Sequence, residues 1–178
     1  MKSARWVRKL PSGTAVLAAA GDLPAAAEAI GDGADLIDLW AASDETAQQV
    51  RDRYPDVPAC ARTDWAELTR DPAAAQRAGA LLVCADPGQA AATGIERGGL
   101  LVEALPDQAA GLVAAGWQVV VCADELPGPH AAAAVAAIAT WLGAVAVRTS
   151  HVTAARRAVD MTETIRGTRP IPAGYVRS

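Results

Sequence analysis

The feature that most constrains this fold is a regular alternation of short apolar runs with alanine-rich helical stretches. Each apolar run is followed by a helical stretch, and strict alternation of this kind predicts a parallel sheet. The runs read as continuous apolar strands, which indicates that both faces of the sheet are covered. The expected strands are residues 14–20, 35–40, 57–63, 80–85, 100–105, 117–123 and 144–149.

The number of units distinguishes a closed barrel from an open sheet. An open flavodoxin-like sheet seldom needs seven units, so we favour a TIM-type (β/α) barrel. Such barrels usually take about 250 residues, and this chain has 178. We therefore expect one compact α/β barrel domain over residues 1–178, with seven to eight parallel strands and shortened helices and loops. An eighth strand is either missing or hidden in a loop, and residues 168–178 form an irregular tail.

Polar residues that follow the predicted strands are the candidate ligand-binding residues. The carboxyl ends of barrel strands meet at one rim, where sites in this architecture lie. The expected rim residues are Asp22, Asp38, Asp64, Asp86, Asp124, Arg148 and His151. Helix N-capping alone would explain four of them, namely Asp22, Asp64, Asp86 and Asp124. We expect Asp64 to cap a helical stretch that carries Trp65 and Leu68. No residue is assigned a catalytic role.

Asp38 and Arg148 have a different alternative. Asp38 lies inside an apolar strand, so it is either paired with a cation or directed into the mouth of the barrel. Arg148, at a strand end, either binds an anion or pairs with a nearby carboxylate. Our hypothesis is a weak pterin or phosphate site centred on Arg148 and Asp86.

Charge and cysteine content limit the partners and the compartment. The net charge is −4 and the charges are scattered, so we expect no nucleic-acid partner. Cys60, Cys84 and Cys122 lie in apolar runs without metal-binding spacing. They predict buried, reduced thiols, no metal site and a cytoplasmic location.

The basic residues near the start of the chain allow a second interpretation of the first apolar run. A basic stretch at residues 2–9 precedes residues 14–20, an order also found in secretory signals. Pro11 and Gly13 interrupt the join and the run is short, so we assign it to a strand. No segment is long and apolar enough to cross a membrane.

The stretch from His130 to Leu142 is apolar on nearly every side. A helix of that kind is buried, whereas barrel helices face solvent on one side. We therefore expect a homodimer formed through residues 130–142.

Two segments carry a family resemblance. Residues 33–39 (Gly-Ala-Asp-Leu-Ile-Asp-Leu) are similar to the GAD-x-IDVG segment of dihydropteroate synthases. Residues 143–152 (Gly-Ala-Val-Ala-Val-Arg-Thr-Ser-His-Val) resemble the last strand of that family, usually GA-x-x-x-R-V-H-D-V. The following helix, which leads to Arg169-Pro170, resembles the C-terminal helix of the family. The chain thus resembles a divergent, shortened dihydropteroate synthase, and the family is commonly dimeric through its late helices.

The resemblance implies a transferase of folate biosynthesis. The family joins a pterin pyrophosphate to p-aminobenzoate at the C-terminal ends of the barrel strands. An Asp, an Asn, a second Asp and a Lys hold the pterin ring. An Arg and a His of the last strand help bind the pyrophosphate, and an Asn of the first strand helps hold magnesium. Arg148 matches that Arg.

Most of the remaining family residues have no counterpart. The first strand ends without Asn, although Asp22 is an oxygen ligand nearby, and only Ser43 matches the Ser-Thr-Arg-Pro-Gly run of the p-aminobenzoate loop. The Ser-Arg-Lys strand is absent. Further replacements are Arg62-Thr63 for Asp-Thr, Ala85-Asp86 for Asn-Asp, Ser150 for the His and His151 for the following Asp.

These replacements imply a loss of synthase activity. A buried pterin group left without its partner costs about 1–3 kcal/mol, so several such losses weaken binding by orders of magnitude. We therefore expect a pseudoenzyme that binds a pterin-like or phosphate-bearing ligand. The first alternative is an active enzyme of pterin metabolism, in which case magnesium would be needed. The second is a structural or assembly protein that acts as an obligate oligomer.

Overall fold

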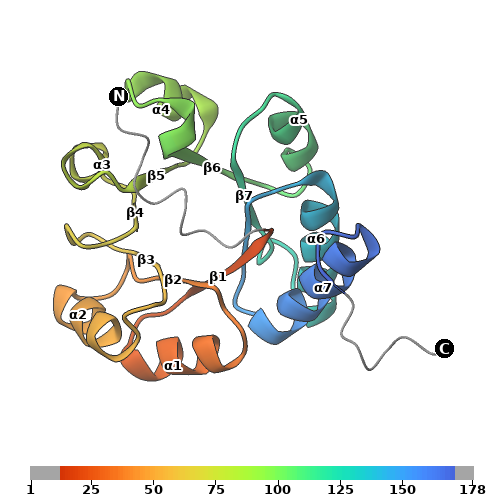
Figure 1. Cartoon of the computed structure of the whole chain (residues 1–178), viewed down its shortest axis with the longest axis horizontal. Coiled ribbons are helices and arrows are strands. Elements are labelled where there is room, and N and C mark those ends of the chain that lie inside the picture. Colours follow the sequence, from red (N-terminus) through yellow and green to blue (C-terminus); the bar gives the residue numbers. More distant parts are fainter. Residues whose placement is uncertain (1–12, 171–178) are drawn as a thin grey trace.

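Eight parallel strands close into a barrel in the computed structural model, which describes residues 13–170 (Figure 1). The strand order follows the sequence, and β8 pairs with β1 to complete the ring. The predicted TIM-type barrel is therefore confirmed. The strands are β1 (Ala15–Ala19), β2 (Leu36–Asp38), β3 (Ala59–Cys60), β4 (Leu68–Thr69), β5 (Leu81–Cys84), β6 (Leu100–Ala104), β7 (Val119–Cys122) and β8 (Ala146–Arg148).

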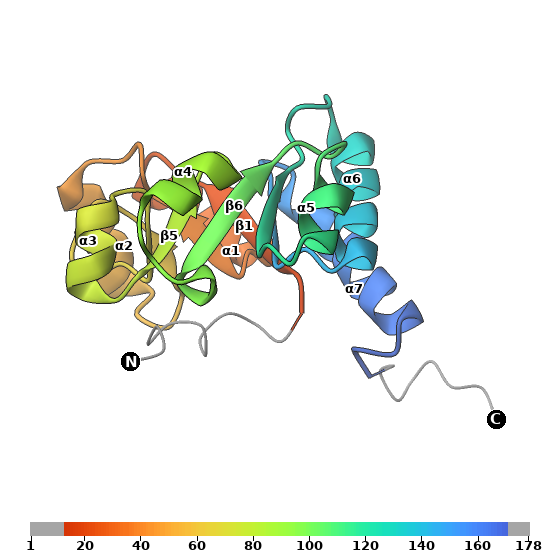
Figure 2. The same ribbon diagram turned by 90° about the horizontal axis from the view of Figure 1, so that it is seen from above.

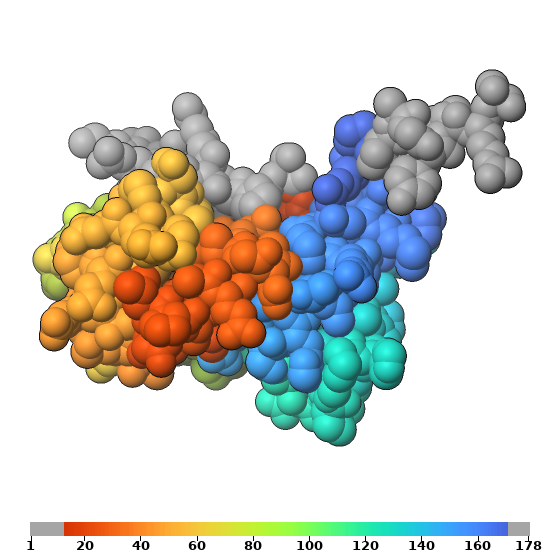
Figure 3. Space-filling model, turned by 90° about the horizontal axis from the view of Figure 1, so that it is seen from below, coloured from red at the N-terminus to blue at the C-terminus, as the bar shows by residue number. Residues whose placement is uncertain are grey.

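Helices surround the ring of strands (Figure 1). Most are short, and within residues 13–170 only α6 and α7 reach 14 residues, which explains how a barrel fits into this length of chain. Figure 2 shows α6 and α7 together at one side of the barrel, and Figure 3 shows α7, in blue, between α1 and α6. The helices are α1 (Leu23–Gly31), α2 (Asp44–Arg53), α3 (Pro72–Ala78), α4 (Pro87–Ala92), α5 (Ala109–Ala114), α6 (Pro129–Leu142) and α7 (Val152–Ile165), with a 3-10 turn, η1, at Arg97–Gly99.

The eighth strand lies where the sequence pattern predicts a helix. We expected Asp64 to cap a helical stretch through Leu68, but residues 61–67 form a tight connection and β4 follows directly. Leu68 pairs with Cys60 on one side and Leu81 on the other. The expectation was wrong because these two cross-strand partners, remote in the sequence, fix the local conformation. The helix begins only at Pro72, after its N-cap Asp71.

Alternation along the strands divides the core into two parts. One apolar cluster receives a side chain from every strand and fills the barrel interior: Ala15, Leu17, Leu36, Cys60, Leu68, Leu81, Val83, Leu101, Val120 and Ala146. The intervening strand residues, such as Val16 and Val147, pack against the helices. Because side chains alternate across a strand, the inward-facing positions of each strand are separated by two residues.

Side-chain caps fix the start of four helices. Asp22 accepts a hydrogen bond from Ala25 N at 2.8 Å, and Asp86 accepts one from Gln89 N at 2.8 Å. Ser43 and Asp71 cap α2 and α3 in the same way. These caps satisfy backbone donors that the first helical turn leaves free.

An ion network holds α7 to the N-terminal end of the barrel. Arg156 contacts Asp35 at 2.6 Å and Asp160 at 2.6 Å. Asp35 also accepts a hydrogen bond from the backbone of β1, and Glu163 accepts one from Thr14 N at 2.7 Å. Gly33 has a φ of 99° and lies so close to Arg156 that a Cβ would meet the arginine side chain at 3.1 Å. We call Asp35, Arg156, Asp160 and Glu163 the base network.

Two parts of the sequence interpretation concern the ends of the chain. The run after the basic stretch is strand β1, as expected, whereas residues 2–9 lie outside the described residues. Residues 171–178 of the expected tail also lie outside them. Within residues 13–170, no helix combines the length and apolar composition needed to span a lipid bilayer.

Candidate functional site

Four charged side chains form the top layer of the barrel interior. Each lies two residues after an inward-facing apolar residue, on the four even-numbered strands. Alternate strands supply each interior layer of a TIM barrel, so period-two spacing brings these four side chains to one level. They are Asp38 at the end of β2, Arg70 just after β4, Glu103 in β6 and Arg148 at the end of β8. We call them the mouth layer.

The mouth layer is a connected ion network. Arg70 makes two parallel hydrogen bonds to the carboxylate of Glu103, each 2.7 Å long, and lies 3.3 Å from Asp38 Oδ2. Arg148 Nε lies 3.2 Å from the same Asp38 oxygen. The other oxygen of Asp38 accepts a hydrogen bond from Trp40 N at 3.0 Å. Asp38 is thus both paired with cations and placed at the mouth.

Burial differs sharply within the mouth layer. The Asp38 side chain is 3% exposed, whereas the Arg148 side chain is 36% exposed. The Nε of Arg148 makes no hydrogen bond with the residues that the structure describes, although it lies in ion-pair range of Asp38. Nε itself is buried against Asp38, so the exposed part of the Arg148 side chain is the cation of the layer best placed to meet a ligand.

A cavity of about 420 Å³ opens above the mouth layer. Its charged wall consists of the four mouth-layer residues, and Trp40 and small residues at the ends of β1 and β2 supply the rest: Ala19, Ala20, Gly21 and Ala41. This volume is within the range of sites that bind small molecules. The cavity lies at the carboxyl ends of the strands, where sites in barrels of this kind occur.

The electrostatics of the layer favour the charged forms of its ion pairs. Burial works to raise the pKa of Glu103, but the hydrogen bonds and charge of Arg70, together with Arg148, outweigh it and lower that pKa. The hydrogen bond to Glu103 in turn raises the pKa of Arg70. Burial, followed by the charge of Asp38, raises the pKa of the Cys60 thiol. Glu103 and Arg70 are therefore ionised at neutral pH, and Cys60 is a neutral thiol.

Two of the predicted rim aspartates are helix caps. Asp22 and Asp86 cap α1 and α4, as the alternative interpretation predicted. Neither lines the cavity above the mouth layer. The hypothesis of a site centred on both Arg148 and Asp86 therefore keeps only Arg148.

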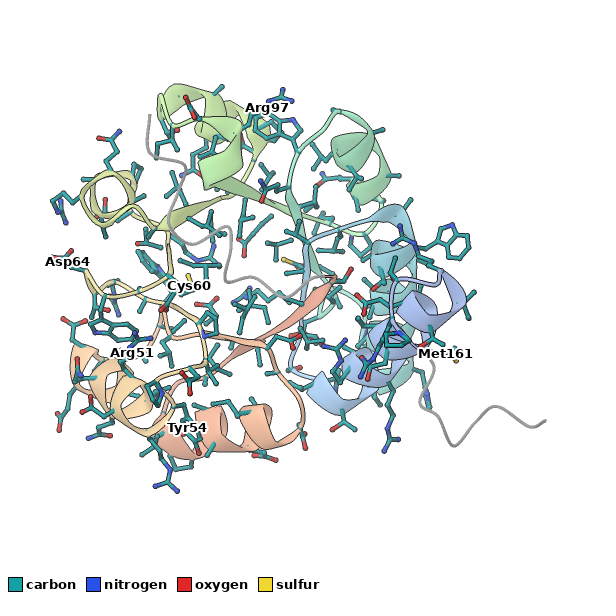
Figure 4. The ribbon with its side chains drawn as sticks, in the orientation of Figure 1. Arg51, Tyr54, Cys60, Asp64, Arg97 and Met161 are labelled. Atoms are coloured by element: carbon teal, nitrogen blue, oxygen red, sulfur yellow. The ribbon has the colours of Figure 1, made fainter. Side chains whose placement is uncertain are left out.

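Two other predicted rim residues have different roles from the expected one. Asp64 caps no helix; it is exposed, and its carboxylate lies 3.5 Å from Arg77. Figure 4 shows Asp64 at the outer edge of the molecule, whereas Cys60 lies on the ring of strands. Asp124 does not cap α6, which begins after Gly128. Instead it accepts hydrogen bonds from Thr149 Oγ1 and Ser150 N, which orders the turn between β8 and α7.

His151 lies at the start of α7 and away from the mouth layer. It lines a larger groove of about 670 Å³ between the N-terminal turns of α6 and α7, with His130 and Met161. The groove contains none of the mouth-layer residues. We place the site in the smaller cavity because the charged groups converge there.

Glu103 and Arg70 are the two mouth-layer residues that were not predicted from the sequence. Glu103 carries the same signal that identified Asp38, since both are single carboxylates inside an apolar strand. Arg70 carries no such signal because its neighbourhood was interpreted as helical. Only the pairing of Leu68 with strands on both sides reveals that Arg70 faces the mouth.

The residues at the mouth do not suit the magnesium that the resemblance associates with activity. Among residues 13–170, no cluster of three His, Cys, Asp or Glu side chains is arranged to hold a metal ion. Ala19 and Ala20 stand where β1 meets the cavity, and the nearby Asp22 is engaged in its cap. The two mouth-layer carboxylates are already paired with arginines.

The barrel resembles solved structures over nearly its whole length. It matches the Mycobacterium tuberculosis protein Rv1207 with a TM-score of 0.72 and 24% identity, over 90% of this chain and 94% of that chain. A Yersinia pestis dihydropteroate synthase matches with a TM-score of 0.68 and 17% identity, over 88% and 94%. A Coxiella burnetii dihydropteroate synthase in complex with pteroic acid matches with a TM-score of 0.61 and 14% identity, over 90% and 96%.

Comparisons at the level of sequence give a different result. No protein-family model matches the chain, and no curated protein matches it. The structural matches lie below 25% identity, so they concern the arrangement of the backbone. The matched structures include dihydropteroate synthases, the family that residues 33–39 and 143–152 resemble. The chain therefore has a dihydropteroate synthase-like fold.

Proposed function

We propose that this chain binds a small pterin-like or phosphate-bearing ligand at the mouth layer and lacks normal dihydropteroate synthase activity. The observation that supports it most directly is Arg148, whose side chain is 36% exposed and lines a cavity at the carboxyl ends of the strands. The solved neighbours include synthases bound to pteroic acid and to a pterine-sulfa conjugate.

The absence of synthase activity is argued from the residues around that cavity. The Ser-Arg-Lys strand and the p-aminobenzoate loop of the resembling family have no counterpart in the sequence. Arg70 and Glu103 occupy the mouth and bind each other. With Arg70 bound to Glu103, only Arg148 remains to stabilise a departing pyrophosphate, which is less electrostatic stabilisation than group transfer requires.

Titration tests the ligand proposal. Purified full-length protein is titrated with 6-hydroxymethylpterin and, separately, with pterin pyrophosphate, and the heat of binding is followed. We expect weak binding of 6-hydroxymethylpterin that Arg148→Met abolishes and that Arg157→Met, at an exposed arginine of α7, leaves intact. Failure of both ligands to bind at millimolar concentration contradicts the proposal.

A coupled assay tests the catalytic part separately. With pterin pyrophosphate, p-aminobenzoate and magnesium, we expect no pyrophosphate release and no rescue of a synthase-deficient strain. Release that depends on p-aminobenzoate would instead support the alternative of an active transferase.

We propose further that two copies associate through α6. Its outer face exposes Ile138 and Trp141, 57% and 60% exposed, and α7 continues the surface with Met161 and Ile165. Figure 4 shows Met161 at the outer edge of the barrel. Four large apolar side chains on two packed helices make a patch typical of an association surface. We place the protein in the cytoplasm because its three cysteines are unpaired.

The mass in solution tests this association. We expect a dimer by light scattering, and a monomer for the double variant I138E/W141E. Leu126→Glu, at an exposed apolar residue outside the two helices, should leave the dimer unchanged. A clean monomer for the unmodified chain contradicts the proposal.

A further inference from the structure

We infer that Glu103 determines the charge of the ligand: by occupying Arg70, it restricts the mouth to neutral or singly charged ligands and excludes polyanions such as pyrophosphate. The inference deepens the proposed ligand site and rests on it. It concerns a residue that neither the family segments nor the rim aspartates indicated.

Glu103 binds Arg70 through both oxygens of its carboxylate. Both Nη atoms of Arg70 donate to the two oxygens of Glu103, each at 2.7 Å. This two-pronged geometry is the one by which arginine binds a phosphate. Glu103 therefore occupies the donors that an incoming phosphate would use.

The positive and negative charges of the mouth layer balance. Two guanidinium groups face two carboxylates, so the four charges cancel. No other basic side chain among residues 13–170 lines the cavity. A ligand with two or more negative charges would meet Asp38 and Glu103 in a partly dry site, where like charges repel more strongly than in water.

Arg148 is the remaining cation of the mouth layer, and it can neutralise only one negative charge of a ligand. Among the described residues, Arg148 forms an ion pair with Asp38 alone, through its buried Nε, and its side chain is 36% exposed. It can thus offer donors to one carboxylate or to a ring oxygen. The uncharged wall of Trp40 and three alanines, at Ala19, Ala20 and Ala41, suits a flat, neutral ring.

A purely structural role for Glu103 makes a different prediction. If Glu103 only stabilised the barrel, its replacement would change the free energy of unfolding and leave anion binding unaffected. The affinity for an anion is therefore the measurement that separates the two roles.

The experiment uses Glu103→Gln in the full chain, with inorganic pyrophosphate as the probe in a calorimetric titration. Glutamine keeps the shape and an oxygen acceptor for Arg70 but removes the charge. We expect the variant to bind pyrophosphate at least about tenfold more tightly than the unmodified protein, because a carboxylate is removed from the immediate surroundings. Glu125→Gln removes one charge from the exposed segment after β7 and should change the affinity by less than about twofold.

Two outcomes overturn the inference: no gain in Glu103→Gln, or an equal gain in Glu125→Gln. If Glu103→Gln lacks a cooperative melt, Glu103→Met provides the same test, since it also removes the charge and keeps most of the volume.

Titration of the unmodified protein with neutral 6-hydroxymethylpterin separates this result from the proposed function. If the unmodified protein binds the pterin but Glu103→Gln gains no affinity for pyrophosphate, the inference is overturned and the proposed function stands. A gain for pyrophosphate without pterin binding supports the inference and contradicts the pterin ligand.

Discussion

Two aspartates that flank the start and the end of β2, three residues apart, serve opposite ends of the barrel. Asp35, just before β2, faces outward, accepts a hydrogen bond from β1 and pairs with Arg156 of α7. Asp38, the last residue of β2, faces inward and pairs with Arg70 and Arg148. The odd spacing places them on different faces of the strand, because side chains alternate. One ion network thus secures a helix, while the other forms the wall of a cavity.

The two aspartate side chains also differ in how much of their surface is exposed to water. The Asp35 side chain is 26% exposed and that of Asp38 is 3% exposed. Water screens the base network, whereas the mouth layer holds its charges only because each has a partner. We therefore expect mutations at the base to change stability alone, and mutations at the mouth to change both stability and ligand binding.

Removing the central cation of the mouth should have the largest effect. Arg70→Met leaves Glu103 without its partner and Asp38 with Arg148 alone, so we expect a loss of about 3–5 kcal/mol in the free energy of unfolding. Urea denaturation measures it. Arg77→Met is the matched control, because its pair with Asp64 is exposed on both sides, and it should cost at most about 1 kcal/mol. Equal costs would remove the distinction between buried and exposed pairs.

The corresponding change at the base should cost less. Arg156→Met breaks contacts to Asp35 and Asp160, which are both partly exposed, so we expect a loss of about 1–3 kcal/mol. Affinity for a mouth ligand should stay the same when measured well below the melting temperature. A change in that affinity would show that the two ends are coupled.

Neutralising each aspartate in turn tests whether an anion binds at the mouth or at the base. Asp38→Asn removes the counter-charge of Arg148, so we expect affinity for inorganic phosphate to rise about fivefold, since a unit charge at 4 Å is worth about 1 kcal/mol even in water. Asp35→Asn should leave that affinity unchanged. A similar response of both variants in a phosphate titration would contradict the assignment of the site to the mouth.

The smallest expected effect is on acid stability. Because the pKa of Glu103 is lower in the folded protein, its stabilisation is present above the ordinary pKa and is lost as the pH falls through the lower, folded value. The free energy of unfolding should therefore fall more steeply for the unmodified protein than for Glu103→Gln as the pH falls below the ordinary pKa value of 4.5. Parallel profiles would mean that Arg70 does not stabilise the ionised carboxylate.

The candidate site was only partly predictable from the sequence. Asp38 and Arg148 could be identified because a charge at the end of an apolar strand is a local signal. Glu103 has the same signal but was not predicted. Asp64 and Asp124 were assigned as caps from local sequence, but their helices begin elsewhere. Capping is a short-range interaction, and it fails as a guide where a strand replaces the expected helix.

The barrel class, seven of the eight strands and the caps Asp22 and Asp86 could be predicted from the sequence, because alternation and capping depend on neighbours within a few residues. The eighth strand and the mouth layer depend on tertiary contacts and could not be predicted from neighbouring residues. Leu68 and Thr69 form β4 because β3 and β5 supply hydrogen bonds from both sides, which outweighs local helical preference. Closure of the ring then brings Arg70 to Glu103, 33 residues away in the sequence.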